Sequence, residues 1–328
     1  MDSSNQEISK EVFPYLRVYK DGTIDRIAGT QVVPPGLDSE TNVISKDITI
    51  IPQTGVTARL YRPNFTTKTA QNHKLPLVVY FHGGAFCISS AFDPLYHTSL
   101  NKLVADSNVV ALSVNYRLAP EHPLPLAYHD SCDVLQWVLS HVVEHSESHE
   151  SWLKDYVDFR RVFLAGDSAG ANIVHYTAIK FHAMDTGPSP IKDFKVTGLI
   201  MVNPYFWGKE PIGVEITDKV RKNMVDNWWG FVCSSNKGND DPLINPFVEE
   251  APGIEGIGCN KVLVTVTEND ILRERGKLYH KNLVNSGWKG IAEFYETEGE
   301  DHDFHIFNPT CDKAKSLIKR LSDFINEH

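Results

Sequence analysis

Short apolar runs alternate with longer amphipathic segments along most of this chain. The apolar runs lie within residues 75–84, 108–120, 160–166, 196–206, 260–270 and 291–299. Continuous runs of this kind are typical of strands that a parallel sheet buries on both faces. Between them, apolar residues recur at helical spacing in 127–145, 171–184 and 312–328. The pattern therefore predicts an α/β fold with a mainly parallel central sheet flanked by helices.

The same pattern predicts one domain over residues 1–328, with two segments that do not fit the sheet. Residues 1–45 are mixed and rich in turn formers, so we expect an N-terminal segment that caps the core. Residues 205–235 carry several aromatic side chains and are a candidate for an additional cap or pocket segment.

The loops that follow the strands are the place to look for chemistry, because ligands gather at the carboxyl ends of parallel strands. Ser168 stands in the sequence LAGDSAGAN, after a predicted strand and before a predicted helix. Gly166 and Gly170 allow the backbone to turn sharply and to expose the serine hydroxyl. The pentapeptide also arises by chance, so the alternative is a helix-capping serine at an ordinary glycine turn.

A serine hydroxyl is a weak nucleophile unless a base accepts its proton. The chain order of this architecture places that base near the C-terminus, where GEDHDFHIF offers His302 and His305. His302 is favoured because polar residues flank it, whereas His305 stands between two apolar residues. A metal site of both histidines with Asp301 and Asp303 is a weaker alternative, since a third ligand segment is lacking.

The base in turn needs a carboxylate that fixes its tautomer and stabilises the imidazolium. Asp270 follows the apolar run 261–267 and lies between the serine and the histidine in chain order, and Glu268 is the alternative. The predicted catalytic residues are therefore Ser168, Asp270 and His302.

Negative charge that develops on a substrate oxygen needs preorganised N–H donors. The sequence YFHGGAF follows the strand at 75–81 and predicts that the N–H groups of Gly83 and Gly84 supply them, together with that of Ala169. We expect His82 to anchor this loop and Cys87 to be a small buried residue.

Composition and charge exclude several other classes. Hydrophobic residues make up 41% and charged residues 23%, as in ordinary globular proteins. The net charge of -10 argues against a nucleic-acid partner and against an anionic membrane surface. The five cysteines form no C-x-x-C pair and indicate free thiols, and neither a signal-like segment nor a membrane-length apolar run is visible. These features predict a cytoplasmic protein, and the oligomeric state stays open.

The segments LPLVVYFHGGAF, SVNYRLAPEHPLP, DFRRVFLAGDSAGANIVH, DDPLINP, CNKVLVTVTENDILRERG and SGWKG, together with VYKDGTIDR near the start, resemble the plant carboxylesterase family. This family belongs to the hormone-sensitive-lipase-like branch of α/β-hydrolases, and the chain looks similar to the subgroup that contains 2-hydroxyisoflavanone dehydratases. The resemblance implies the same triad and oxyanion donors, an N-terminal cap, and neither a metal nor a cofactor. Many relatives read H-G-G-G where this chain has Ala85, which is a departure from the family pattern.

The resemblance also implies hydrolysis of small to medium carboxylic esters, of plant specialised metabolites, through an acyl-enzyme. A dehydratase-like or alkaloid-processing elimination or cyclisation is the alternative. Related hormone receptors lack the catalytic histidine, so the presence of His302 disfavours a non-catalytic receptor. For the substrate pocket we expect aromatic walls, with ordinary core packing as the alternative for each residue: Phe86, Tyr205, Phe206, Trp207, Trp228 and Trp229.

Overall fold

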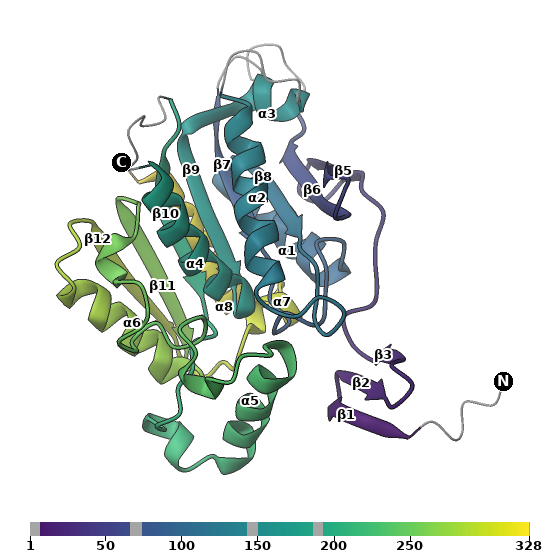
Figure 1. The fold of residues 1–328 in the computed structure, drawn as a ribbon. Helices are drawn as coiled ribbons and strands as arrows, with labels where there is room; N and C mark the ends of the chain where they lie inside the picture. Colours follow the sequence, from purple (N-terminus) through teal and green to yellow (C-terminus); the bar gives the residue numbers. More distant parts are fainter. Residues whose placement is uncertain (1–6, 66–73, 143–149, 186–192, 328) are drawn as a thin grey trace.

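A nine-stranded sheet forms the centre of the molecule (Figure 1). The computed structural model describes residues 7–65, 74–142, 150–185 and 193–327. The strand order is β12-β11-β10-β9-β7-β8-β6-β5-β4. The strands from β12 to β8 pair in parallel, and β6, β5 and β4 continue the sheet antiparallel. The bounds are β4 Leu37–Asp38, β5 Val43–Ile51, β6 Val56–Pro63, β7 Leu75–Phe81, β8 Val110–Asn115, β9 Val157–Asp167, β10 Val196–Val202, β11 Lys261–Thr267 and β12 Ile291–Thr297.

Helices cover both faces of this sheet. One apolar cluster joins α1 and α8 to one face, and another joins α2, α4 and α6 to the opposite face. The central strand β7 shows why its sequence is a continuous apolar run, since all seven residues are buried. Val78 belongs to the first cluster, and its neighbours Leu77 and Val79 belong to the second. The predicted α/β fold with a mainly parallel sheet is therefore confirmed.

The helices agree with the predicted segments where those were identified. The bounds are α1 Pro94–Ser107, α2 Leu126–Ser140, α3 Ser151–Tyr156, α4 Ala169–Asp185, α5 Lys219–Val232, α6 Arg273–Asn285, α7 Phe304–Phe307 and α8 Asp312–Asn326, with 3₁₀ turns η3 Gly213–Ile216, η4 Gly238–Asp240 and η5 Ile254–Gly256. The end of the helix predicted at 127–145 lies outside the described residues. Among the described helices, none is both long and apolar enough to span a bilayer.

Two segments lie beyond one end of the central sheet (Figure 1). The strands β1 (Ile8–Val12), β2 (Leu16–Tyr19) and β3 (Ile24–Arg26) form a separate antiparallel sheet, and α5 contacts β1. We name residues 7–30 and 219–232 the cap. The segment predicted at 1–45 is too long, because β4 and β5 already belong to the central sheet, and residues 1–6 lie outside the described part.

Arg26 fastens the N-terminal part of the cap to the body. Its guanidinium donates to the carbonyl oxygens of Cys87 at 2.8 Å and Ala119 at 2.9 Å, and it also pairs with Glu121. Because Cys87 follows the glycine-rich loop after β7, this contact ties the cap directly to that loop.

Candidate active site

Ser168 occupies a sharp turn between β9 and α4. Its φ of 50° lies in the left-handed region, which non-glycine residues seldom adopt outside functional turns. The two glycines of the turn are there because the backbones approach closely. A Cβ on Gly170 would lie 1.9 Å from the carbonyl oxygen of Phe81, and one on Gly166 would lie 2.5 Å from the Gly170 carbonyl carbon. The turn therefore packs directly against the end of β7.

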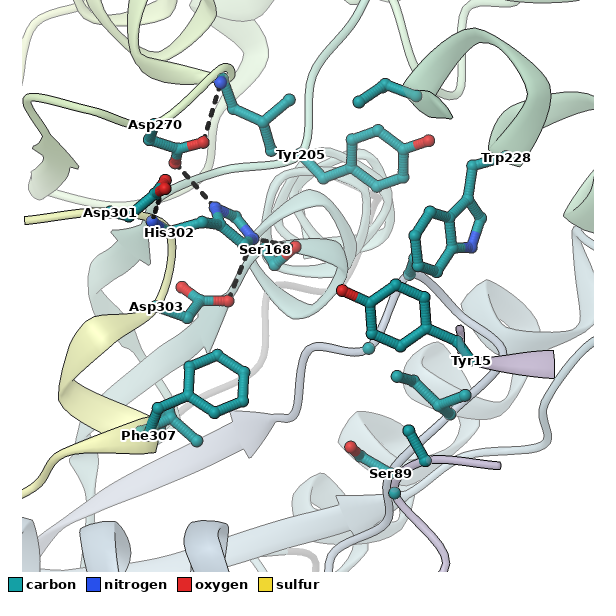
Figure 2. A pocket seen from close by; sticks show the side chains of 18 of the residues that line it. Tyr15, Ser89, Ser168, Tyr205, Trp228, Asp270, Asp301, His302, Asp303 and Phe307 are labelled. Carbon is teal, nitrogen blue, oxygen red and sulfur yellow. Dashed lines mark hydrogen bonds and ion pairs between the residues drawn. The ribbon is translucent and has the colours of Figure 1, made fainter. Parts of the chain in front are cut away.

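The structure brings Ser168, His302 and Asp270 together from three separate loops (Figure 2). The Oγ of Ser168 lies 2.9 Å from Nε2 of His302, and Nδ1 of His302 lies 2.7 Å from Oδ2 of Asp270. The other oxygen of Asp270 accepts the backbone N–H of Leu272 at 2.8 Å. Asp270 is thereby held from both sides, and His302 has one nitrogen for the carboxylate and one for the hydroxyl.

The alternatives from the sequence lie elsewhere. Glu268 is exposed and accepts the backbone N–H of Gly299 at 2.7 Å. His305 is buried in α7, and burial lowers its pKa to about 3. In the part of the chain that the structure describes, no group of three or more His, Cys, Asp or Glu side chains is arranged to hold a metal ion.

Carboxylates dominate the electrostatics around His302. Burial lowers the pKa of His302, but with both Asp270 and Asp303 ionised their charges would outweigh burial and raise it to about 10. Asp303 contributes because its Oδ2 lies 3.1 Å from Nε2 of His302, on the side of the ring that also faces Ser168 (Figure 2). The histidine therefore meets two carboxyl groups, one at each nitrogen.

The glycine loop differs from the sequence prediction at one residue. The N–H of Gly83 donates to the hydroxyl of Tyr96 at 2.8 Å, and Gly83 does not line the cavity beside Ser168. A Cβ at Gly83 would lie 2.3 Å from Oδ2 of Asp167, so close packing explains this glycine. The predicted role of Gly83 as an oxyanion donor is wrong, because its N–H already has a partner.

Gly84 and Ala85 line the cavity next to Ser168. Both have positive φ, 96° and 47°, and neither N–H has a backbone partner among the described residues. Ala169 is the first residue of α4, where an N–H has no partner within its own helix. These three backbone groups are the candidates to bind an anionic oxygen.

His82 anchors the start of this loop, as expected. Its ring stacks on Tyr116 with centroids 4.3 Å apart, and its Nδ1 lies 2.7 Å from the carbonyl oxygen of Gly83. Burial lowers the pKa of His82 to about 4, so the ring is neutral at physiological pH. Cys87 is also buried, which raises the pKa of its thiol to about 12.

A cavity of about 460 Å³ opens beside the nucleophile. Residues of the catalytic loops form one side, and the cap forms the other (Figure 2). The rings of Tyr15 and Trp228, one from each part of the cap, lie 5.1 Å apart. The apolar walls also include Leu95, Met224, Val225, Ile271, Leu272, Ile306 and Phe307.

Only part of the predicted aromatic wall lines this cavity. Tyr205 and Trp228 do, whereas four residues belong to the packed core instead: Phe86, Phe206, Trp207 and Trp229. Neighbours in sequence point in different directions, which explains the error. On α5, Trp228 faces the cavity and Trp229 faces the core, since successive helical residues are rotated by about 100°.

The ring contacts of the core residues show what they do. Phe206 stacks on Tyr279 at 4.7 Å, and the indole N–H of Trp207 donates to Asp226 at 2.7 Å. Phe86 packs between Tyr205 and Trp229 rather than against open space. Predicting these four residues as pocket walls was therefore wrong.

Four lining residues were not predicted from the sequence: Tyr15, Arg221, Asp303 and Phe307. Arg221 lies seven residues before Trp228 on α5, so the spacing of one helical face was the available signal. Its guanidinium donates to the backbone carbonyl of Asn269 at 2.8 Å, which ties α5 to the loop of Asp270.

The comparison with known proteins agrees with this geometry. A family model described as the alpha/beta hydrolase fold matches residues 78–306. "Probable carboxylesterase 2" of Arabidopsis thaliana is 52% identical over 327 residues, covering 100% of this chain and 99% of that protein. A "2-hydroxyisoflavanone dehydratase" of Glycyrrhiza echinata is 41% identical over 327 residues, covering 98% of each chain.

Solved structures give the same result. A hyperthermophilic esterase from the archaeon Pyrobaculum calidifontis is 28% identical with a TM-score of 0.67, and the match covers 86% of this chain and 84% of that one. The match to the family model and the full-length matches to plant relatives show the family. This chain belongs to the α/β-hydrolase family, among the plant carboxylesterases and 2-hydroxyisoflavanone dehydratases.

Proposed function

We propose that this protein is a serine carboxylesterase that hydrolyses small to medium esters through an acyl-enzyme. The observation that carries the proposal is the hydrogen-bonded line from Ser168 through His302 to Asp270 at the edge of a cavity. A hydroxyl, a base and an orienting carboxylate in this order are what nucleophilic acyl transfer requires. The names of the carboxylesterase relatives support the same activity.

In the first half-reaction, Ser168 attacks the ester carbonyl while its proton passes to Nε2 of His302. The tetrahedral intermediate collapses, His302 gives that proton to the leaving alcohol, and the acyl group stays on Ser168. In the second half-reaction, a water attacks the acyl-enzyme and gives a proton to His302. The second tetrahedral intermediate collapses, His302 returns that proton to Oγ of Ser168, and the acid is released. Asp270 holds the ring and stabilises the imidazolium in both halves.

The oxyanion of each intermediate is bound by the N–H groups of Gly84, Ala85 and Ala169. This assignment is shifted by one residue from the sequence expectation, because Gly83 donates to Tyr96. Alanine is acceptable at position 85 because its backbone N–H, rather than its side chain, is the functional group. Loss of one such donor typically lowers kcat by about 10²–10³-fold.

The cavity supports a small to medium substrate with apolar groups. Its volume of about 460 Å³ lies in the usual range for small-molecule sites, and its walls are largely apolar. Esters of plant specialised metabolites fit this description, and the plant origin of the relatives points in the same direction.

The test is hydrolysis of p-nitrophenyl acetate together with labelling by a fluorophosphonate. Wild type should hydrolyse the ester and form a single adduct on Ser168. Ser168→Ala should lose at least about 10⁴-fold in kcat and all labelling, because removal of a triad serine eliminates the covalent route. Circular dichroism and thermal unfolding of the variant serve as the fold control, and hydrolysis by Ser168→Ala at the wild-type rate would refute the nucleophile.

Elimination is the second candidate, because the relatives include 2-hydroxyisoflavanone dehydratases. Incubation with 2-hydroxyisoflavanone should then give isoflavone, and the absence of product would remove this candidate. Tight ligand association without turnover and without an adduct would instead indicate a receptor.

The cytoplasmic location stays a prediction. Two relatives carry names that place them in organelles, one mitochondrial and one chloroplastic. Fractionation of tissue with an antibody against the native protein would decide the compartment.

A further inference from the structure

A second carboxyl group lies beneath the catalytic histidine. Asp303 is 5% exposed, and its Oδ2 lies 3.1 Å from Nε2 of His302, the nitrogen that also faces Ser168. Its other oxygen accepts the side-chain N–H of Asn203 at 3.3 Å. The φ of Asp303 is 52°, which lies in the left-handed region that non-glycine residues seldom adopt. The triad mechanism described above does not use this group.

Asp303 neighbours Asp167, which is fully buried, closely enough for each carboxyl group to shift the pKa of the other. The two oxygens of Asp167 accept the hydroxyl groups of Tyr80 at 2.7 Å and Tyr96 at 2.6 Å. Two neighbouring buried carboxyl groups favour a state in which they hold one proton between them. Because Asp167 already accepts two hydroxyl donors, it is the better stabilised anion, and the shared proton belongs on Asp303.

The charges around Asp303 favour the same assignment. Burial, Asp167 and Asp270 all raise the pKa of Asp303 well above its ordinary value, although His302 opposes them. Burial also raises the pKa of Asp167. Three ionised carboxylates around one neutral imidazole would bury uncompensated charge, which proteins avoid by taking up a proton.

The other titratable neighbours add no positive charge to this pair. Burial raises the pKa of Tyr80 and Tyr96 well above 10, and it keeps His305 neutral. Arg221 lies at the cavity edge, where it pairs with Asp218 and approaches the exposed Asp301.

The state of Asp303 matters for the base. An ionised carboxylate 3.1 Å from Nε2 would hold His302 as an imidazolium, which cannot accept the proton of Ser168. A protonated Asp303 removes that charge, yet its carbonyl oxygen still accepts Nε2–H once the imidazolium forms.

We propose that Asp303 is a positioning residue for His302 that carries the proton of the Asp303–Asp167 pair in the working enzyme, so that His302 stays a free base. This inference rests on the proposed function, because it assigns His302 as the catalytic base. The pair also links His302 through Asp167 and Tyr96 to Gly83, so it joins the histidine loop to the glycine loop.

The experiment compares the pH profile of kcat/KM in wild type, Asp303→Asn, Asp167→Asn and the double variant. In Asp167→Asn the anion that holds the proton is gone, so Asp303 ionises beside His302. We expect the midpoint of the acid limb to rise by about one pH unit or more, and kcat/KM at pH 7 to fall by about tenfold and to recover at higher pH. The amide of Asp303→Asn imitates the neutral acid, so its kcat falls by about threefold with the midpoint in place.

The double variant separates this account from a structural one. Adding Asp303→Asn to Asp167→Asn should return the midpoint to the wild-type value, because no ionisable group then faces Nε2. The proposal is overturned if Asp303→Asn alone lowers the midpoint by about one pH unit, which would mean that Asp303 is ionised in wild type. A loss in Asp167→Asn that is equal at every pH would also overturn it.

Infrared spectroscopy tests the proton without turnover. Wild type should show the carbonyl band of a protonated buried carboxylic acid, and Asp303→Asn should lack it. If no ester is hydrolysed, this band still decides the protonation of Asp303, so failure of the proposed function and failure of this inference are distinguishable.

Discussion

The catalytic loops and the cap are built in opposite ways. The residues Ser168 and Asp270 are 6% and 1% exposed, and they lie on loops at the ends of buried parallel strands. The cap instead leaves apolar side chains in solvent, with Phe13 at 66% and Val220 at 82% exposure. The proposed triad is therefore held by buried loops of the core, whereas one side of the cavity comes from a cap that is more exposed to solvent.

Replacing a glycine by alanine should affect the free energy of unfolding very differently in the two regions, and this is the largest expected difference. Gly170→Ala places a Cβ against the Phe81 carbonyl oxygen, so we expect unfolding to become easier by about 3 kcal/mol or more, or folding to fail. Gly230→Ala in α5 is the matched change, since a Cβ there would meet no heavy atom of the described residues within 4 Å. It should stabilise the protein by up to about 1 kcal/mol through helix propensity. Urea unfolding measures both, and equal stabilities would break the comparison.

Acid should lower the stability of the α/β core through buried histidines, and the cap has none. Burial lowers the pKa of His82 and His175 to about 4 and that of His305 to about 3, while the cap contains no histidine. The unfolded chain binds these protons first, so stability is complete above about pH 6.5 and falls as the pH drops toward 4.

Each of these histidines then contributes about 3 kcal/mol to the loss. Urea unfolding between pH 7.5 and pH 4.5 measures it. In His175→Gln, the slope of the unfolding free energy against pH should correspond to about one proton fewer taken up on unfolding. A wild-type unfolding free energy that stays constant from pH 7 to pH 5 would contradict the prediction.

Two neighbouring tryptophans of α5 give the smallest expected difference, because one lines the cavity and the other packs in the core. Trp228→Ala removes a cavity wall, so the KM of a bulky aryl ester should rise by about tenfold, more than that of an acetate ester. Trp229→Leu should lower stability by about 2 kcal/mol, because its ring is packed in the core, and should shift KM far less. Steady-state kinetics with both esters, beside thermal unfolding, distinguishes them, and the same KM change in both variants would mean that the cavity is wrongly bounded.

Much of the fold, and the meeting of the three proposed triad residues, could be predicted because the signals are local. A fully apolar run such as 75–81 is expected to be buried on both faces of a sheet. The glycines on either side of Ser168 predict a sharp turn at the end of a strand. Polar flanking residues then favour His302 over His305, and the position past the end of the strand favours Asp270 over Glu268. Each of these decisions uses residues close together in sequence.

Tertiary structure alone decided which partner each group meets. Whether Gly83 or Ala85 offers a free N–H depends on Tyr96, thirteen residues away, and whether Asp303 keeps a proton depends on Asp167. The aromatic walls were mispredicted for the same reason, since hydrophobicity predicts burial but does not tell a core from a cavity. The sequence by itself determined which candidate catalytic groups follow the strands and in what order, and packing between distant segments determined their hydrogen-bond partners and the space around them.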